Sequence, residues 1–316
     1  MSKLPLVIVN PASARGSTRG AWPKHASDLR THFGAFNCAF TESETDAVRL
    51  AEDAAREGRK LIIACGGDGT ISEVANGILR SGCEAILGIL PSGTGGDFRR
   101  TLKIPTRAAD AAQVLRNGKT RSIDVGRATY LDSKGDEASR FFLGVASFGM
   151  SAEVIARVKE DENSLLKIAT PRIIGGKLSY AIATAKATFA NPVTRVHVKL
   201  DDKTERRLSV VQFCIANARY FGGGMKIAPD ALLDDGKFDV VVIDDIGALK
   251  ILANGPQLYF GTHLSIKGVH HTHATSVNAS PASKSERIQI EVDGELPGYL
   301  PAKFEILPRA LRVKTV

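Results

Sequence analysis

Two short loops rich in glycine and aspartate, at residues 66–70 and 91–97, each directly follow an apolar run that predicts a buried strand. The first loop reads Gly-Gly-Asp-Gly-Thr and the second reads Pro-Ser-Gly-Thr-Gly-Gly-Asp. In such loops glycine lets backbone N–H groups approach phosphate oxygens, a hydroxyl adds a donor, and aspartate can hold Mg²⁺. Two loops of this kind on adjacent strands would form a nucleotide site, so an α/β sheet is predicted.

The segment after the first loop has the periodicity of a helix. Ile71, Val74, Ala75 and Ile78 recur at i, i+3, i+4 and i+7, so a helix is expected to begin where the loop ends. Its N-terminus would then point at the bound anion. Neither a G-x-x-x-x-G-K-S/T loop nor a G-x-G-x-x-G turn after a strand occurs, which excludes a Walker A loop and the dinucleotide fingerprint. Glycine clusters also make simple tight turns, but two clusters that share one strand-loop pattern favour phosphate binding.

Strands and helices alternate over the first 125 residues. We expect strands at 4–9, 38–41, 61–65 and 85–90, and further helices at 22–33, 45–57 and 107–116. This alternation predicts a doubly wound parallel sheet with ligands at the carboxyl ends of its strands. Residues 1–125 are therefore expected to form a nucleotide-binding α/β domain.

Strand candidates become frequent after residue 126 and are mostly linked by turns of Gly, Asp and Asn. They lie at 141–146, 193–200, 208–216, 237–243, 269–277, 287–292 and 302–307. Helical stretches near 151–159 and 173–189 interrupt them. We expect residues 126–308 to form an antiparallel β-rich sandwich, and residues 309–316 are candidates for a strand that returns to the first domain.

Composition limits the class of protein and its partners. The 42 Lys and Arg against 34 Asp and Glu give a net charge of +8, which favours anionic partners such as nucleotides or lipid headgroups. The basic residues are scattered and aromatic residues make up only 6%, so a nucleic-acid platform is not expected. No signal peptide or membrane-spanning run is visible, and the four cysteines form no C-x-x-C pair. These features indicate a reduced, cytoplasmic protein.

An ordered series of motifs resembles the diacylglycerol kinase catalytic family, which includes bacterial lipid kinases, sphingosine kinases and ceramide kinase. In the first domain the motifs are Asn-Pro-Ala-Ser at 10–13, the first loop through residue 77, residues 88–98, and Ile-Asp-Val-Gly at 123–126. Later motifs follow in the right order at 148–152, 222–231, 235–240 and 292–295. The resemblance covers nearly the whole chain and implies an N-terminal domain of the NAD kinase and phosphofructokinase type.

One position departs from the family pattern. The second loop of the family usually reads Gly-Thr-x-Asn-Asp, and here Gly96 stands at the asparagine position while Asp97 is retained. The missing side chain removes a donor and loosens the turn, which would alter nucleotide or substrate preference without abolishing the site.

The resemblance implies ATP and Mg²⁺ as cofactors and assigns residues to both. Asp68, Asp97 and Asp124 would organise the magnesium ion and its waters, and Asp68 would also take part in catalysis. The residues that would contact ATP are Asn10, Pro11, Ala12, Ser13, Ala14, Thr41, Gly66, Gly67, Asp68, Gly69, Thr70, Ile71, Ser72, Glu73, Gly93 and Thr94.

Phosphoryl transfer also needs a carboxylate that accepts the proton of the attacking hydroxyl group. By resemblance, Glu295 is the general base and Asp293 supports it. If the strand at 287–292 continues through both residues, their side chains project from one face. Gly294 suggests a turn instead, in which case the two carboxylates are near each other without sharing a face. Read alone, the Asp-Gly-Glu triplet would be a solvated hairpin tip.

Two other groups of residues could hold metal ions. Asp235 and the main-chain carbonyls of Leu232 and Lys237 form a second position suited to Mg²⁺, structural in the family, although an Asp-Gly hairpin turn accounts for the spacing equally well. His270, His271 and His273 could indicate zinc, but with no cysteine nearby in a polar stretch they are interpreted as a surface cluster.

The expected activity is that of an ATP- and Mg²⁺-dependent lipid kinase that phosphorylates the hydroxyl group of diacylglycerol, phosphatidylglycerol, a sphingoid base or a related lipid. The protein would associate peripherally with the inner face of the membrane, and a homodimer is compatible with the sequence. The alternatives are a soluble-metabolite kinase of the NAD kinase type and a non-catalytic protein that binds nucleotide or lipid.

Overall fold

The computed structural model describes residues 3–92, 96–163, 193–283 and 285–316. Its N-terminal part contains a parallel sheet of four strands in the order β2–β1–β3–β4. The strands are β1 (Leu6–Val9), β2 (Asn37–Phe40), β3 (Leu61–Gly66) and β4 (Ile86–Pro91). All four lie within two residues of the predicted strands. Because the strands are parallel neighbours, the two glycine-rich loops both begin at the carboxyl ends of the strands, on the same side of the sheet.

Helices cover this sheet in two packed pairs. Helix α2 (Asp46–Arg56) packs against α3 (Asp68–Ser81), and α1 (Ser17–His32) packs against α5 (Ala108–Asn117). The predicted apolar stripe of α3 is buried, including Ile71, Val74, Ala75 and Ile78. Helix α1 begins five residues before the predicted start and holds Pro23 within it. A short helix, α4 (Asp97–Thr101), follows the second loop.

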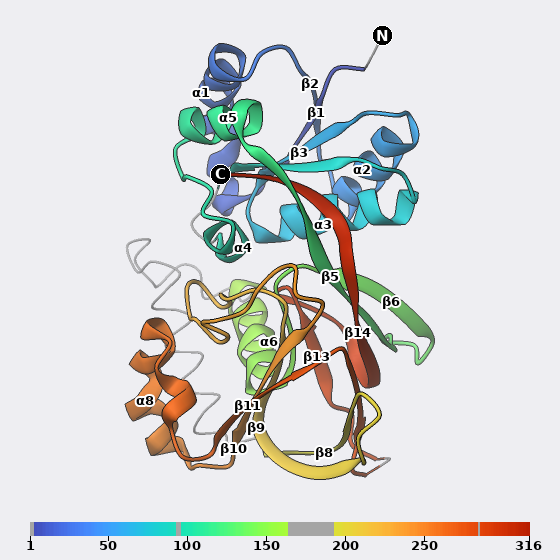
Figure 1. Ribbon diagram of the computed structural model, residues 1–316, viewed down its shortest axis with the longest axis vertical. Helices are drawn as coiled ribbons and strands as arrows, with labels where there is room; N and C mark the ends of the chain where they lie inside the picture. Colours follow the sequence, from blue (N-terminus) through green and yellow to red (C-terminus); the bar gives the residue numbers. More distant parts are fainter. Residues whose placement is uncertain (1–2, 93–95, 164–192, 284) are drawn as a thin grey trace.

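Two long antiparallel strands connect the N-terminal part to the β-rich part. Strand β5 (Lys119–Leu131) pairs with β14 (Glu295–Thr315) over most of its length, and Figure 1 shows the two running together between the upper and lower halves. The end of β14 also pairs in parallel with β4, where Arg312 lies opposite Ile86. The C-terminal strand thus extends the N-terminal sheet.

The β-rich part contains a closed ring of six paired strands, in the order β9–β7–β13–β14–β12–β8 and back to β9. Its other members are β7 (Val145–Gly149), β8 (Thr194–Leu200), β9 (Arg206–Ala216), β12 (Ser276–Pro281) and β13 (Gln289–Val292). Strands β10 (Phe238–Asp244) and β11 (Val269–Ala274) extend it beyond β9, and β6 (Glu137–Phe142) pairs with β5. The antiparallel, β-rich character predicted for this half is confirmed.

Each half has its own hydrophobic core. The first core is built from the N-terminal sheet and its helices, and Leu311 and Val313 of β14 belong to it. The second core fills the strand ring and includes the stacked rings of Phe148 and Phe213, whose centroids lie 4.8 Å apart. Along β14, alternate residues (Leu300, Ala302, Phe304 and Ile306) belong to this core, as the period of two predicts.

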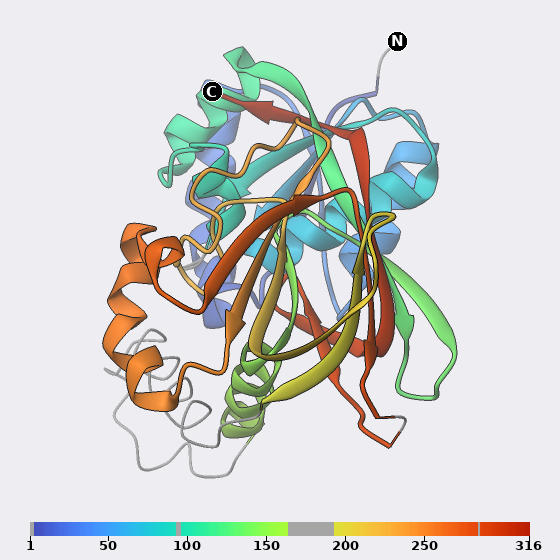
Figure 2. The same cartoon turned by 60° about the horizontal axis from the view of Figure 1, so that its bottom comes forward.

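Two helices flank the ring. Helix α6 (Met150–Asn163) packs against β7, β9 and β13, and α8 (Ala248–Phe260) lies beside the edge formed by β10 and β11, as Figure 2 shows. The sequence predicts α6 but not α8. The helix predicted at 173–189 lies outside the described residues. None of the described helices combines the length and apolar character needed to cross a bilayer.

Two predicted strands are wrong in their continuity. The expected strand at 141–146 is divided between β6 and β7, because the backbone N–H groups of Leu143 and Gly144 turn away to bind a carboxylate. The expected strand at 269–277 is divided between β11 and β12 at Thr275, whose N–H and hydroxyl group both donate to Asp201.

Candidate active site

Asp68 joins the two glycine-rich loops. It is the first residue of α3, and its carboxylate accepts hydrogen bonds from the backbone N–H groups of Gly96 (2.7 Å), Asp97 (2.9 Å) and Phe98 (3.2 Å). These three N–H groups belong to the first turn of α4, where a carboxylate is stabilised by unpaired donors. Residues 30 positions apart in the chain are thereby held together at the carboxyl edge of the sheet.

The loop after β1 lies against the first glycine-rich loop. The Asn10 side chain donates to the Thr70 hydroxyl group (3.1 Å) and accepts from the Ala12 N–H (3.0 Å). Gly66 lets the Thr70 side chain pack against the backbone of this loop, because a Cβ atom at Gly66 would lie 2.7 Å from the Cβ of Thr70. The residues predicted to contact ATP at 10–12 and 66–70 are therefore adjacent in space.

A chain of hydroxyl groups extends from this loop to the second one. The Ser13 Oγ lies 2.6 Å from the Thr18 Oγ1, which lies 2.6 Å from the Ser92 Oγ. Thr18, which the sequence did not single out, is fully buried at the centre of the chain. Between Ser13 and Thr18, Ala14 and Arg15 adopt φ values of 54° and 56°, a left-handed backbone that costs non-glycine residues about 1 kcal/mol each. Such strain often marks binding loops.

Asp97 extends the site to a third glycine-rich segment. Its carboxylate accepts from the Gly223 N–H (2.7 Å) and forms an ion pair with Arg100 (2.8 Å). Burial raises the pKa of Asp97, and the neighbouring charge of Asp68 raises it further. Asp68 and Asp97 therefore form a pair of adjacent acidic groups whose mutual repulsion a divalent cation would relieve.

The Asp293-Gly294 pair forms a tight hairpin turn between β13 and β14. Val292 pairs with Glu295 across it, and both turn residues have positive φ (49° and 84°), as a type I′ turn requires. The strand does not continue past Val292, so the same-face arrangement of Asp293 and Glu295 is wrong and the turn alternative holds. Asp293 is not a solvated tip residue, because its carboxylate accepts from the N–H groups of Leu143 (2.9 Å) and Gly144 (2.8 Å).

Asp293 also reaches the N-terminal half of the molecule. Its Oδ2 accepts a hydrogen bond from the Ser72 hydroxyl group of α3 over 3.1 Å. Burial raises the pKa of Asp293, and its hydrogen bonds to Leu143, Gly144 and Ser72 partly offset that rise. Ser72 lies one helical turn after Asp68, so a single turn of α3 contacts both glycine-rich loops and the acidic hairpin.

Glu73, the next residue of α3, faces the same hairpin. Burial raises the pKa of its carboxyl group, and the charge of Glu295 contributes to the rise. A hydrogen bond from the Thr45 backbone and the charge of Arg140 act in the opposite direction. Glu73 and Glu295 are thus electrostatic neighbours at the boundary between the two halves.

Glu291 is a buried acid that the sequence analysis missed. It lies on β13, is 4% exposed, and accepts hydrogen bonds from the Ser147 hydroxyl group and the Gly294 N–H (2.7 Å). Burial raises the pKa of its carboxyl group to about 7. The Ser147 Oγ lies 2.6 Å from the Ser151 Oγ. The Ser151 N–H donates to the Gln212 Oε1, and the Gln212 Nε2 donates to the Ser151 Oγ. A buried polar network therefore holds the hairpin through the hydrogen bond between Glu291 and Gly294.

Asp124 lies at a different place from the other predicted magnesium residues. It is fully buried, and its carboxylate accepts from the N–H groups of Gly236 (2.6 Å) and Arg309 (2.7 Å). Its own N–H donates to the Leu233 carbonyl group (2.6 Å). In the described part of the chain, Asp68, Asp97 and Asp124 do not gather into one group of ligand atoms within 4.8 Å. Asp124 instead fixes the 232–237 turn.

The remaining predicted residues are placed as follows. Leu232, Asp235 and Lys237 are exposed in the turn that Asp124 holds, where the Asp235 carboxylate accepts from the Lys237 N–H (3.1 Å). The Thr41 N–H donates to the Val9 carbonyl group (2.9 Å), which places Thr41 beside the end of β1. Gly93 and Thr94 lie outside the described residues.

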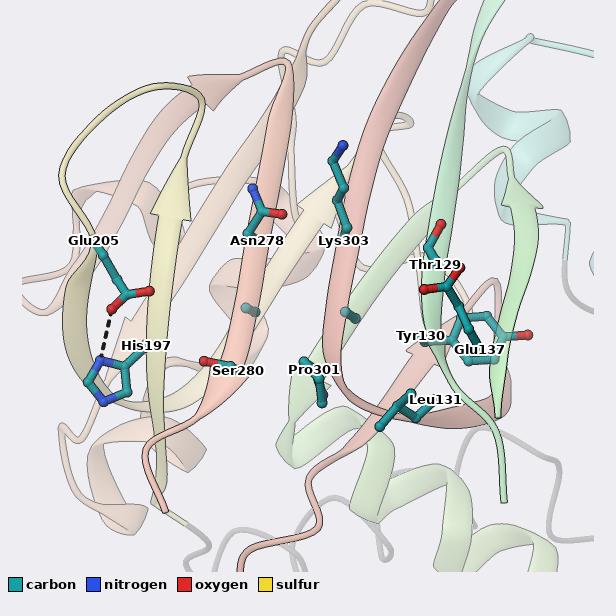
Figure 3. A pocket seen from close by; sticks show the side chains of 12 residues that line it. Thr129, Tyr130, Leu131, Glu137, His197, Glu205, Asn278, Ser280, Pro301 and Lys303 are labelled. Carbon is teal, nitrogen blue, oxygen red and sulfur yellow. Dashed lines mark ion pairs between the residues drawn. The ribbon is translucent and has the colours of Figure 1, made fainter. Parts of the chain in front are cut away.

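A groove of about 300 Å³ lies elsewhere, on the outer face of strands β8, β12, β14, β5 and β6. Figure 3 shows its mixed lining, with the ion pair of His197 and Glu205 (3.4 Å) at one side and Tyr130 and Leu131 at the other. None of the predicted site residues lines it.

Comparison with known proteins gives matches over nearly the whole chain. Residues 5–128 match the model of the diacylglycerol kinase catalytic domain, and residues 144–315 match the YegS C-terminal NAD kinase beta sandwich-like domain. A diacylglycerol kinase of Bacillus subtilis is 29% identical over 312 residues, covering 97% of this chain and 94% of the relative. A diacylglycerol kinase of Staphylococcus haemolyticus is 29% identical over 320 residues, and the alignment covers 100% of this chain and 89% of that relative.

Solved structures share the fold. The protein in a solved structure from Bacillus anthracis strain Sterne is 25% identical to this chain. The two structures align with a TM-score of 0.77, over 99% of this chain and 97% of the Bacillus anthracis chain. The crystal structure of a diacylglycerol kinase from the same strain aligns with a TM-score of 0.70 at 22% identity, and the alignment covers the same shares of the two chains. The arrangement of an α/β half followed by a β-rich half is therefore shared by these proteins.

Proposed function

We propose, from the premise that this chain belongs to the diacylglycerol kinase family, that it transfers the γ-phosphoryl group of ATP to the hydroxyl group of diacylglycerol or a related lipid with the help of Mg²⁺. The family models cover both halves, and the full-length relatives are named diacylglycerol kinases, so the chain is a phosphotransferase of the lipid kinase type.

The single observation that carries the proposal is the position of α3. Asp68 at its start holds the second glycine-rich loop, and Ser72 one turn later holds the acidic hairpin. Four residues of helix rise about 6 Å. This spacing favours a reaction in which a phosphoryl group held by the loops meets a hydroxyl group held near Glu295, because phosphoryl transfer depends on positioning and charge.

The phosphate-binding part of the proposal rests on the donors at the edge of the sheet. No side chain caps the N-terminus of α3, so its first backbone N–H groups are available to an anion. We assign ATP to the loop at 10–14, to Thr41, to the residues at 66–73, and to Gly93 and Thr94; the contact of Asn10 with Thr70 in the first turn of α3 supports this assignment.

The acidic groups fit a magnesium ion in part. Asp68 and Asp97 are adjacent, and the Asp68 Oδ1 and the Asp97 Oδ2, which each accept one backbone N–H, retain a second lone pair for a metal-bound water. Bound Mg²⁺ would neutralise charge on the phosphates. Asp124 does not fit as a ligand of the same ion, because it is fully buried and, in the described part of the chain, its carboxylate does not gather with those of Asp68 and Asp97. Its proposed role is to shape the 232–237 turn, where Leu232, Asp235 and Lys237 would hold a structural cation.

Glu295 is the proposed general base that accepts the proton of the lipid hydroxyl group. Asp293 is a positioning residue, because its carboxylate binds Ser72, Leu143 and Gly144 and so fixes the hairpin. Glu291 acts on the same hairpin through the Gly294 N–H.

The proposed architecture follows the two cores. We infer a doubly wound parallel domain of residues 1–125 with 309–316, of the NAD kinase and phosphofructokinase type, and a lipid-substrate domain of residues 126–308. The packed pairs α2–α3 and α1–α5 and the return of β14 to β4 support this division. The net charge of +8 supports peripheral binding to the anionic inner face of the membrane from the cytoplasm.

The test is phosphate transfer from γ-labelled ATP to a lipid panel in mixed micelles, with diacylglycerol, phosphatidylglycerol, a sphingoid base and NAD as acceptors. Glu295→Gln should lower turnover by at least 100-fold, since general base catalysis contributes about 10²–10⁴-fold. Glu305→Gln is the matched control, because this half-buried acid of the same strand forms ion pairs with Arg127 and Lys303, outside the proposed site. Labelled NAD, or no labelled acceptor at all, would overturn the proposal in favour of the alternative functions.

A further inference from the structure

We infer that Asp239, His271 and His273 form a binding site for a transition-metal ion such as Zn²⁺, separate from the kinase site. Among the residues that the structure describes, they are the one group of three or more His, Cys, Asp or Glu whose ligand atoms all lie within 4.8 Å of one another. The sequence places the two histidines beside each other but gives no sign of the aspartate, which is 32 residues away.

The pairing of two strands brings the three side chains together. Strands β10 and β11 are antiparallel, with Asp239 directly opposite His273 and Val241 opposite His271. Residues 271 and 273 are two apart on β11, so their side chains share one face of the sheet. His270 points to the other face and pairs with Asp244 (2.8 Å). The backbone therefore selects two of the three histidines.

The distances are close to those of a coordinated ion. The Asp239 Oδ1 lies 2.7 Å from the His271 Nε2 and 3.5 Å from the His273 Nε2. Around a tetrahedral zinc ion with bonds of about 2.0–2.2 Å, ligand atoms are roughly 3.4 Å apart. The His273 spacing already matches, and a small outward shift of His271 satisfies the other. Both imidazoles would then carry their proton on Nδ1.

The chemistry and exposure of the group favour zinc-like ions. Two imidazole nitrogens and one carboxylate oxygen are borderline ligands that Zn²⁺, Co²⁺, Ni²⁺ and Cu²⁺ bind in preference to Mg²⁺. The Asp239 side chain is 5% exposed, while those of His271 and His273 are 27% and 51% exposed. A buried carboxylate anchors the site, and its outer side is open to solvent for a fourth ligand. The ion would cross-link β10, through Asp239, to β11, through His271 and His273.

The experiment is a calorimetric titration of ZnCl₂ into the full chain, prepared without a histidine tag and in excess MgCl₂ to occupy oxygen-rich sites. We expect one zinc ion per chain, lost or weakened at least tenfold in His271→Gln and in His273→Gln. His270→Gln is the matched control and should bind as the wild type does. Cobalt substitution should give the visible absorption of a tetrahedral ion in the wild type and the control only.

Two further measurements keep the result decisive. Thermal unfolding without metal shows whether each variant is folded, and His273, the most exposed ligand, is the variant expected to keep its stability. Anomalous diffraction from a crystal soaked in zinc should place the ion between Asp239, His271 and His273. No zinc binding by the wild type, equal binding by His273→Gln, or an ion located elsewhere would each overturn the inference.

Discussion

The Ser72 hydroxyl group on α3 donates a hydrogen bond to the Asp293 carboxylate over 3.1 Å, although the two residues are 221 positions apart. This contact joins the α/β half of the molecule to the hairpin that carries Glu295. Because Asp293 also binds the Leu143 and Gly144 N–H groups, the hairpin is fixed from both sides. The position of the proposed base is thus tied to the helix that begins in the phosphate loop.

Replacing Ser72 with alanine should impair catalysis more than stability. Loss of the hydrogen bond should cost about 1–3 kcal/mol of unfolding free energy. The cost stays in this range because the Asp293 carboxylate keeps its hydrogen bonds from Leu143 and Gly144. The hairpin would lose its link to α3, so turnover should fall by tenfold or more. Ser81→Ala, at the far end of the same helix, is the control for kinetics and urea unfolding. Equal turnover in the two variants would contradict the positioning role.

Asp68→Ala should lower both stability and activity. The change leaves the N–H groups of Gly96, Asp97 and Phe98 without their acceptor, and loss of an N-terminal cap costs about 0.5–2 kcal/mol. Asp53→Ala, on the exposed face of α2, removes a surface carboxylate instead and should change stability by less than about 0.5 kcal/mol. Urea unfolding of the two variants tests this difference, and matching midpoints would show that Asp68 does not stabilise the second loop.

Gly66→Ala should destabilise the first loop, whereas Gly67→Ala should not. A Cβ atom at Gly66 would lie 2.7 Å from the Thr70 Cβ, while one at Gly67 would meet no atom within 4 Å. Such overpacking typically costs about 1–3 kcal/mol. Comparison of the two unfolding temperatures isolates the steric effect, because both variants replace glycine with the same residue in one loop. The prediction fails if Gly67→Ala is the less stable protein.

Glu291→Gln should remove a pH dependence of stability. The pKa of Glu291 rises from its ordinary value of 4.5 to about 7 in the folded protein, so the folded state holds more protons than the unfolded state between these values. Wild-type stability from this group is therefore fully present below pH 4.5 and is lost as pH rises through 7, by at most about 1.4 kcal/mol per pH unit. Urea unfolding from pH 5 to 8 should show the variant gaining on the wild type. Parallel stability curves would mean that Glu291 does not titrate in this range.

The sequence predicted the N-terminal half well because its signals are local. Ile71, Val74 and Ala75 mark the buried face of α3 by spacing alone, and the glycine loops mark the ends of β3 and β4. Helix α8 was missed because Gly255 and Pro256 within it are weak helix formers that resemble turn residues. Leu258 nevertheless packs against a hydrophobic cluster of the β-rich half, a contact that the local sequence does not indicate.

The site shows the same division. The ordered series of motifs predicted which acidic residues belong to the site, but only the fold shows which groups each acid binds. Glu291 alternates with the core residues Ile290 and Val292, so its pattern predicts a solvent-facing side chain. It is buried because α6 covers that face of β13 and supplies Ser151 to the polar network. Such a partner, 140 residues away, leaves no local signal.

Strand β14 contributes Phe304 to the core of the strand ring and Val313 to the core of the parallel sheet. Melting either half would therefore strip the other of a buried strand, so heat or denaturant should unfold the two as one cooperative unit. Their pairings also span large sequence separations, so we expect this protein to fold slowly.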